Sequence, residues 1–207
     1  MKSIDLRTNK LFLRNDFPSD NKWGFALVKK QSLDLSNVEL LACSDTKAKE
    51  EEKNRNKGVH FFVDDIRFKG VFEYPLRTLK KFKQYSFMLT PDYSLYADMP
   101  LWLQIGNVGK NRYVGAFWQK EGLLVIPTIS WALKQSYEFC FDGVERGGIV
   151  AVGTIGSKHA KKSFLNGYDC MLEMIRPMAV LCYGTPFKEM RGNIISVDYI
   201  QSRRKIR

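Results

Sequence analysis

Several short apolar runs of the sequence are followed directly by carboxylates. If these runs are parallel strands, their carboxyl ends meet along one edge of a sheet, where α/β proteins bind ligands. The carboxylates concerned are Asp45, Asp64 or its neighbour Asp65, and Asp92. Brought together, they would suit a hard cation such as Mg²⁺. Because Asp is also a frequent N-cap residue after a strand, helix capping is the preferred explanation.

A glycine-rich turn follows another apolar run. The segment Val152-Gly-Thr-Ile-Gly-Ser157 separates a predicted strand from a predicted helix. Gly153, Thr154 and Gly156 would let backbone N–H groups approach a phosphate at the helix N-terminus, and Lys158 would add charge. The segment has the spacing of neither the dinucleotide fingerprint nor the P-loop, so a plain tight turn is the preferred alternative.

Arg112 lies on the apolar stripe of a predicted helix. It shares that stripe with Leu101, Ile105, Val108 and Ala116. An arginine that faces a core requires a partner, which we expect to be Asp92, Asp142 or a ligand anion. A structural ion pair is the preferred interpretation, while Asp92, Ser94 and Arg112 are the candidate catalytic residues.

Two further side chains are candidate ligand contacts. Trp131 follows the fourth of the apolar runs and has the chemistry to stack on a base or a sugar, although a packed tryptophan is more common. Gln104 lies on a face adjoining the Arg112 stripe, where it either hydrogen-bonds a ligand or faces water. With two histidines and no Gly-x-Ser-x-Gly elbow, the sequence does not favour a Ser-His triad.

The elements that must position these residues follow an α/β pattern. Seven apolar runs are predicted as strands: 39–43, 59–63, 87–90, 123–128, 149–154, 179–183 and 194–199. Runs such as Leu-Leu-Val-Ile-Pro and Ile-Val-Ala-Val-Gly are apolar on both faces, which is typical of parallel strands. Helices are predicted at about 98–120, 133–141 and 161–176. We therefore expect a mostly parallel sheet of six or seven strands with βαβ crossovers, either open and doubly wound or a partial (β/α) barrel.

The length of 207 residues fits one domain. Residues 1–57 lack the βα rhythm and are expected to form an irregular lead-in packed on a core domain at 58–207. Within the lead-in, the mixed-charge run 47–57 is predicted as a solvated loop or an exposed helix.

Composition and charge indicate which partners and which cellular location to expect. The net charge of +11 favours polyanionic partners, although the basic residues are spread widely and cluster only at 80–83, 158–162 and 203–207. Apolar runs of membrane-spanning length and a secretory leader are both missing, so we expect a cytoplasmic protein without a membrane partner. The four cysteines form no Cys-x-x-Cys pair and are predicted to be free thiols in apolar surroundings.

Longer blocks of the sequence carry a family resemblance. They include Thr90-Pro-Asp-Tyr-Ser-Leu-Tyr96, Asn111-Arg112, Ser130-Trp131 and Cys140-Phe-Asp-Gly143. Over roughly 61–199 the chain resembles a domain-of-unknown-function family of Gram-positive bacteria, their phages and mobile elements. The resemblance implies a phage or mobile-element setting and assigns no activity to any residue.

Three functions remain open. The leading hypothesis is a protein that binds or acts on nucleic acid or nucleotides through a cleft at the carboxyl ends of the strands. The first alternative is an interaction protein that inhibits or redirects a host complex. The second is a small-molecule or nucleotide enzyme that uses a divalent metal, with Mg²⁺ as the cofactor to test.

Overall fold

Seven short parallel strands run through residues 8–198, the part of the chain that the computed structural model describes. The first sheet contains β1 (Leu40–Ala42), β2 (Gly58–His60), β3 (Phe87–Leu89) and β4 (Val125–Ile126). The second sheet contains β5 (Ile149–Gly153), β6 (Ala179–Tyr183) and β7 (Ile194–Val197). The predicted α/β fold with parallel strands is confirmed, with the strands divided between two sheets.

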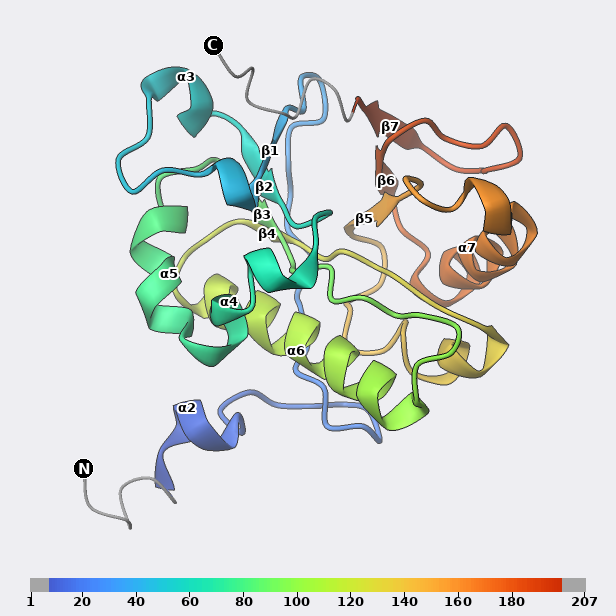
Figure 1. The fold of residues 1–207 in the computed structure, drawn as a ribbon, viewed down its shortest axis with the longest axis horizontal. Helices are drawn as coiled ribbons and strands as arrows, with labels where there is room; N and C mark the ends of the chain where they lie inside the picture. Colours follow the sequence, from blue (N-terminus) through green and yellow to red (C-terminus); the bar gives the residue numbers. More distant parts are fainter. Residues whose placement is uncertain (1–7, 199–207) are drawn as a thin grey trace.

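The two sheets join between β4 and β5. Thr128 and Ala151 form a parallel bridge, and the Ile129 N–H donates to the Ala151 carbonyl at 2.8 Å. Across both sheets the strands follow chain order, whereas a doubly wound sheet reverses its order at a switch point. Chain order is the order of a (β/α) barrel. Of the two predicted architectures, the structure therefore has the partial barrel (Figure 1). The barrel is partial because no strand pairing joins β7 to β1 among the described residues.

An apolar cluster fills the concave side of the strands. It takes residues from six of the seven strands, including Leu40, Leu89, Ile126, Ala151, Leu181 and Val197. The remaining strand, β2, contributes Gly58, where an added Cβ atom would lie 2.1 Å from the Phe87 ring. Glycine at this position is what allows the large Phe87 side chain into the interior.

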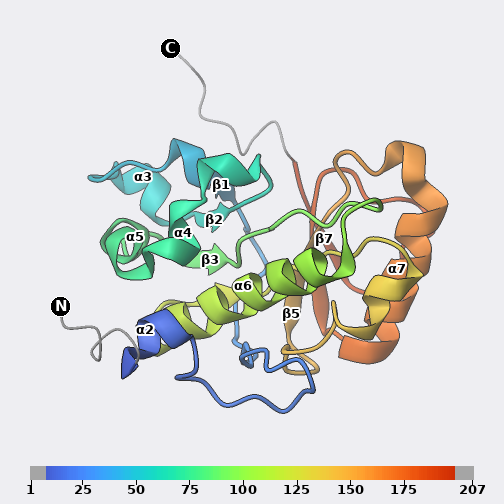
Figure 2. The same cartoon turned by 60° about the horizontal axis from the view of Figure 1, so that its bottom comes forward.

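Two long helices cover the outer side. α6 (Leu101–Lys120) crosses both sheets, because Trp118 packs in the cluster behind the first sheet and Val108 in the cluster behind the second (Figure 2). α7 (Lys161–Ile175) packs on the second sheet through Tyr168 and Met171. The shorter helices are α2 (Lys10–Leu13), α3 (Glu52–Arg55), α4 (Gly70–Glu73) and α5 (Pro75–Phe82). Short 3-10 turns are η1 (Cys43–Asp45), η2 (Asp65–Arg67), η3 (Lys134–Glu138) and η4 (Lys158–Ala160).

Several predicted boundaries change. α6 begins at Leu101 with Pro100 as its N-cap, so Asp98 does not cap it. The helix predicted at 133–141 is only the 3-10 turn η3, and α5 was not predicted. α7 ends as predicted, because Arg176 takes a left-handed conformation just before Pro177. The boundary between lead-in and core domain stays a prediction, and β1, on the lead-in side, pairs with β2.

Candidate functional site

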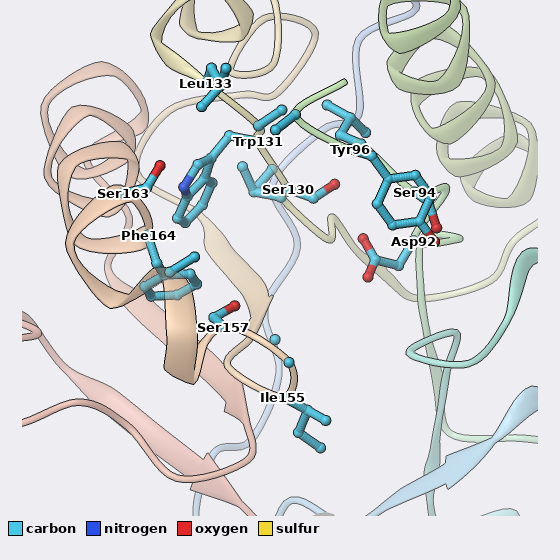
Figure 3. A pocket seen from close by; sticks show the side chains of 17 residues that line it. Asp92, Ser94, Tyr96, Ser130, Trp131, Leu133, Ile155, Ser157, Ser163 and Phe164 are labelled. Carbon is cyan, nitrogen blue, oxygen red and sulfur yellow. The ribbon is translucent and has the colours of Figure 1, made fainter. Parts of the chain in front are cut away.

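A cleft of about 530 Å³ opens at the carboxyl ends of β3, β4 and β5, beside the start of α7 (Figure 3). This volume lies within the range of small-molecule sites. Of the residues singled out from the sequence, the cleft brings together Asp92, Ser94, Trp131, Gly153 and Gly156. Among the described residues that line it, none is Lys or Arg.

The cleft has an aromatic wall and a polar wall. Trp131 and Phe164 lie on one side, with their ring centroids 5.0 Å apart, and Asp92 and Ser94 lie opposite them (Figure 3). Ser130 lies between the two walls. The two walls would let a flat molecule contact the aromatic rings with its apolar surface and Asp92 with its polar edge.

Asp92 is the one charged residue among the described residues of the lining. Its Oδ1 atom is shut off from solvent and has no hydrogen-bond partner among the described residues. Burial raises the pKa of the carboxyl group to about 7, and the nearby negative charge of Asp65 adds to the rise, while a hydrogen bond from the Ser130 side chain opposes it. The acid therefore titrates near neutral pH, and its buried Oδ1 lacks the compensation that a hydrogen-bond partner would give.

Ser94 is tied to Asp65, which the sequence suggested only as an alternative to Asp64. The Ser94 hydroxyl donates to Asp65 Oδ1 at 2.8 Å, and its backbone N–H donates to Asp65 Oδ2 at 3.1 Å. On the other side, Asn107 Nδ2 donates to the Ser94 carbonyl at 2.8 Å. These bonds fix the loop after β3 and leave the Ser94 oxygen as an acceptor at the cleft.

Arg112 lies behind the cleft and does not line it. Its guanidinium donates to the carbonyl oxygens of Cys140 at 2.7 Å and Asp142 at 2.8 Å, and to Asn111 Oδ1 at 2.6 Å. No carboxylate forms an ion pair with it among the described residues. The predicted anionic partner is thus replaced by neutral oxygens, and Arg112 ties α6 to the Cys140-Phe-Asp-Gly143 segment. Burial lowers its pKa to about 10, so the group stays charged at neutral pH.

A small buried polar network holds the ends of β3 and β4. Asn111 Nδ2 donates to the Pro91 carbonyl at 2.8 Å, and Thr90 donates its hydroxyl to Asn111 Oδ1 at 3.1 Å. The Thr128 N–H donates to Thr90 Oγ1 at 2.7 Å. The residues that follow these strand ends supply the polar wall of the cleft. The sequence did not predict this role of Asn111. The only feature that could have indicated it is its position next to Arg112, an arginine that faces the core.

Comparison with known proteins places the chain in a family. A family model described as "Domain of unknown function (DUF4417)" matches residues 17–200. The chain belongs to the DUF4417 family. It is 40% identical over 129 residues to the Gene 1 protein of Mycobacterium phage L5, which covers 61% of this chain and 56% of the relative. It is 34% identical over 177 residues to the Gene 1 protein of Mycobacterium phage D29, covering 84% and 65%.

The expected phage-associated family without a known activity is therefore confirmed. The DUF4417 chain spans between about a half and two thirds of the length of these two relatives. No solved structure matches it. Among the described residues, the DUF4417 chain has no helix long and apolar enough to cross a membrane.

Other predicted ligand contacts of this DUF4417 chain serve its own backbone. Gln104 is buried away from the cleft and donates to the Met99 carbonyl at 2.7 Å. Thr154 is buried and donates to the Thr185 carbonyl at 3.0 Å. Lys158 begins η4, and its side chain lies outside the described part of the structure, as does the basic segment 203–207. Gly156 has a φ of +85°, which explains a glycine at this turn without a phosphate.

The predicted metal ligands are not gathered at the cleft. The Asp64 side chain is 84% exposed and lies 3.8 Å from Arg67 on η2, and Asp45 belongs to η1. Of the three carboxylates, only Asp92 lines the cleft. Within residues 8–198, no three His, Cys, Asp or Glu side chains are grouped so as to hold a metal ion.

Gly167 lets Trp131 pack tightly on α7, where an added Cβ atom would lie 2.1 Å from Trp131 Nε1. Gly167→Ala is therefore expected to displace the indole and to lower the free energy of unfolding by about 1–3 kcal/mol. The matched control is Gly106→Ala on α6, where an added Cβ meets nothing within 4 Å. It should stabilise the helix by up to about 1 kcal/mol. Urea denaturation checks both values, and equal effects of the two changes would contradict the packing argument.

Proposed function

We propose that this protein binds nucleotides or single-stranded nucleic acid by taking a nucleobase into the cleft. The observation that carries the proposal is the Asp92 side chain, which lines the cleft opposite an aromatic wall and whose buried Oδ1 has no partner among the described residues. A buried carboxylate oxygen left unpaired costs free energy, and a ligand N–H group would remove that cost.

The chemistry of the walls supports a base rather than a phosphate inside the cleft. Stacking of a base on an aromatic side chain contributes about 1–3 kcal/mol, and Trp131 and Phe164 offer such rings. A phosphate beside Asp92 would meet a like charge, and no lysine or arginine is among the described residues of the lining. Sugar and phosphate groups would therefore lie toward the mouth, and the net charge of +11 supports the approach of a polyanion.

Isothermal titration calorimetry with nucleosides, nucleotides and short single-stranded oligonucleotides tests the proposal. Wild type should bind at least one of these classes, and Asp92→Asn should weaken that binding by about ten-fold or more, because it removes a charge-assisted hydrogen bond. Asp64→Asn makes the same chemical change at a position that is outside the cleft and exposed, so it should bind like wild type.

The salt dependence separates the cleft from the basic surface. Nucleoside binding should change little between about 50 and 200 mM salt, whereas any binding of oligonucleotide phosphates should weaken steeply. Folded wild-type protein that binds none of the ligands would defeat the proposal. So would Asp92→Asn binding that matches Asp64→Asn.

Binding to a host protein is the second candidate. Its support is the exposure of large apolar side chains at the cleft mouth and at the start of α6, where Tyr96 is 61% and Trp102 73% exposed. Exposed aromatic residues are enriched in protein interfaces. Affinity capture from host extract discriminates between the two candidates, because recovery of a defined partner that Trp102→Ala fails to capture would favour the second.

A further inference from the structure

The polar wall of the cleft offers hydrogen-bond acceptors rather than donors. The hydroxyl proton of Ser94 is committed to Asp65, and the side chain of Ser130 hydrogen-bonds to the carboxyl group of Asp92. Each hydroxyl has one proton, so the oxygen atoms of both serines face a ligand as acceptors. Asp92, whose buried Oδ1 has no partner among the described residues, lines the same wall, so the polar side chains on this side of the cleft are acceptors.

An acceptor surface of this kind discriminates among the nucleobases. The Watson–Crick edge of guanine carries two adjacent donors, the ring N1–H and the exocyclic amino group. Adenine and cytosine place an amino donor beside a ring nitrogen acceptor, and uracil and thymine place one N–H between two carbonyls. A carboxylate satisfies two adjacent donors at once, but it repels the lone pair of a neighbouring acceptor.

We infer that the cleft selects guanine, with Asp92 accepting from the N1–H and amino groups while the ring packs against Trp131. The inference rests on the proposed function and deepens it, because it names the base. The dimensions agree with this assignment, because a cleft of about 530 Å³ has room for a two-ring base together with part of its sugar.

The protonation of Asp92 gives the inference a pH signature. Guanine requires the ionised carboxylate, and burial raises the pKa of Asp92 to about 7. Guanosine affinity should therefore rise as the pH increases through about 7 and then level off. A bound guanine would itself lower the pKa of Asp92, so the midpoint in the complex should lie below the midpoint in the free protein.

Calorimetry at about pH 8 with guanosine, inosine and adenosine tests the inference on the full chain. Inosine is guanosine without the exocyclic amino group, so it isolates one of the two donors. We expect guanosine to bind about ten-fold more tightly than inosine, and adenosine to bind more weakly than either. The nucleosides carry no phosphate, so attraction to the basic surface does not enter the comparison.

Asp92→Asn supplies a readout that a merely structural role would not give. A carboxamide places a donor beside an acceptor, which complements adenine rather than guanine. The variant should therefore lose the preference for guanosine over inosine and bind adenosine more tightly than wild type does. Asp64→Asn should keep the wild-type order of the three nucleosides.

The possible outcomes distinguish the guanine assignment from the proposed function. Equal binding of all three nucleosides, or a wild-type preference for adenosine, would overturn the guanine assignment and leave the proposed function standing. An Asp92→Asn variant that is folded and keeps the guanosine preference would also overturn it. If folded wild type binds no nucleoside and no oligonucleotide, both the assignment and the proposed function fail.

Discussion

Asp92→Asn is expected to stabilise the folded chain at about pH 8 and to change its stability little at about pH 4. The pKa of Asp92 rises from 3.8 to about 7 on folding, so the native state holds its proton more tightly than the unfolded state does. Stability is then lost as the pH rises from about 4 to about 7, and the loss is complete above that window. At about 1.4 kcal/mol for each pKa unit, Asp92 costs the native state as much as about 4 kcal/mol.

Urea denaturation across this pH range measures the effect. The difference in the free energy of unfolding between Asp92→Asn and wild type should grow with pH and level off above about 7. Asp64→Asn is the control, because its exposed side chain should give a difference that stays nearly constant with pH. Parallel curves for Asp92→Asn and wild type would show that Asp92 is not desolvated in the native state.

The second large effect concerns Arg112. Arg112→Met is expected to lower the free energy of unfolding by about 3–5 kcal/mol, because it leaves buried oxygen atoms without a donor. The carbonyl oxygens of Cys140 and Asp142 lose their donor, whereas Asn111 Oδ1 loses one of two and keeps the Thr90 hydroxyl. Methionine retains most of the length of the side chain, so the loss reports mainly on the hydrogen bonds.

Arg191→Ala is the control for Arg112. The Arg191 side chain is 70% exposed and lies 2.8 Å from Asp169, and exposed ion pairs contribute less than about 1 kcal/mol. Urea denaturation compares the two variants. Similar losses for both would mean that the carbonyl oxygens around Arg112 find other donors.

Arg112 and Asp92 have opposite effects on the stability of the folded chain. Arg112 is satisfied by several neutral oxygens of its own chain, whereas Asp92 Oδ1 has no partner among the described residues. A buried group that costs stability and faces a cleft is typical of a binding site, since the compensation comes from a ligand. This contrast is why Asp92, and not Arg112, is the centre of the proposed function.

The local pattern of the sequence was sufficient to predict strands and a helix that lie near the cleft. The run 179–183 coincides with β6, and the apolar spacing before Pro177 locates α7. Such signals are local, because a buried parallel strand is apolar on both faces and a helix on a sheet repeats its apolar residues every three or four positions. The placement of Asp92 and Trp131 beyond adjacent strands follows from the same patterns.

What the sequence determined by itself is therefore the α/β class, the parallel strands and the membership of Asp92, Ser94 and Trp131 in one edge. Only the tertiary structure decided that the strands keep chain order around an interior cluster, that Arg112 is bound by backbone oxygens, and that Asp45 and Asp64 lie apart from Asp92. The physical reason is the range of the interactions. Hydrophobic periodicity acts over a few residues, whereas the partner of a buried charge is chosen by packing between segments distant in the chain.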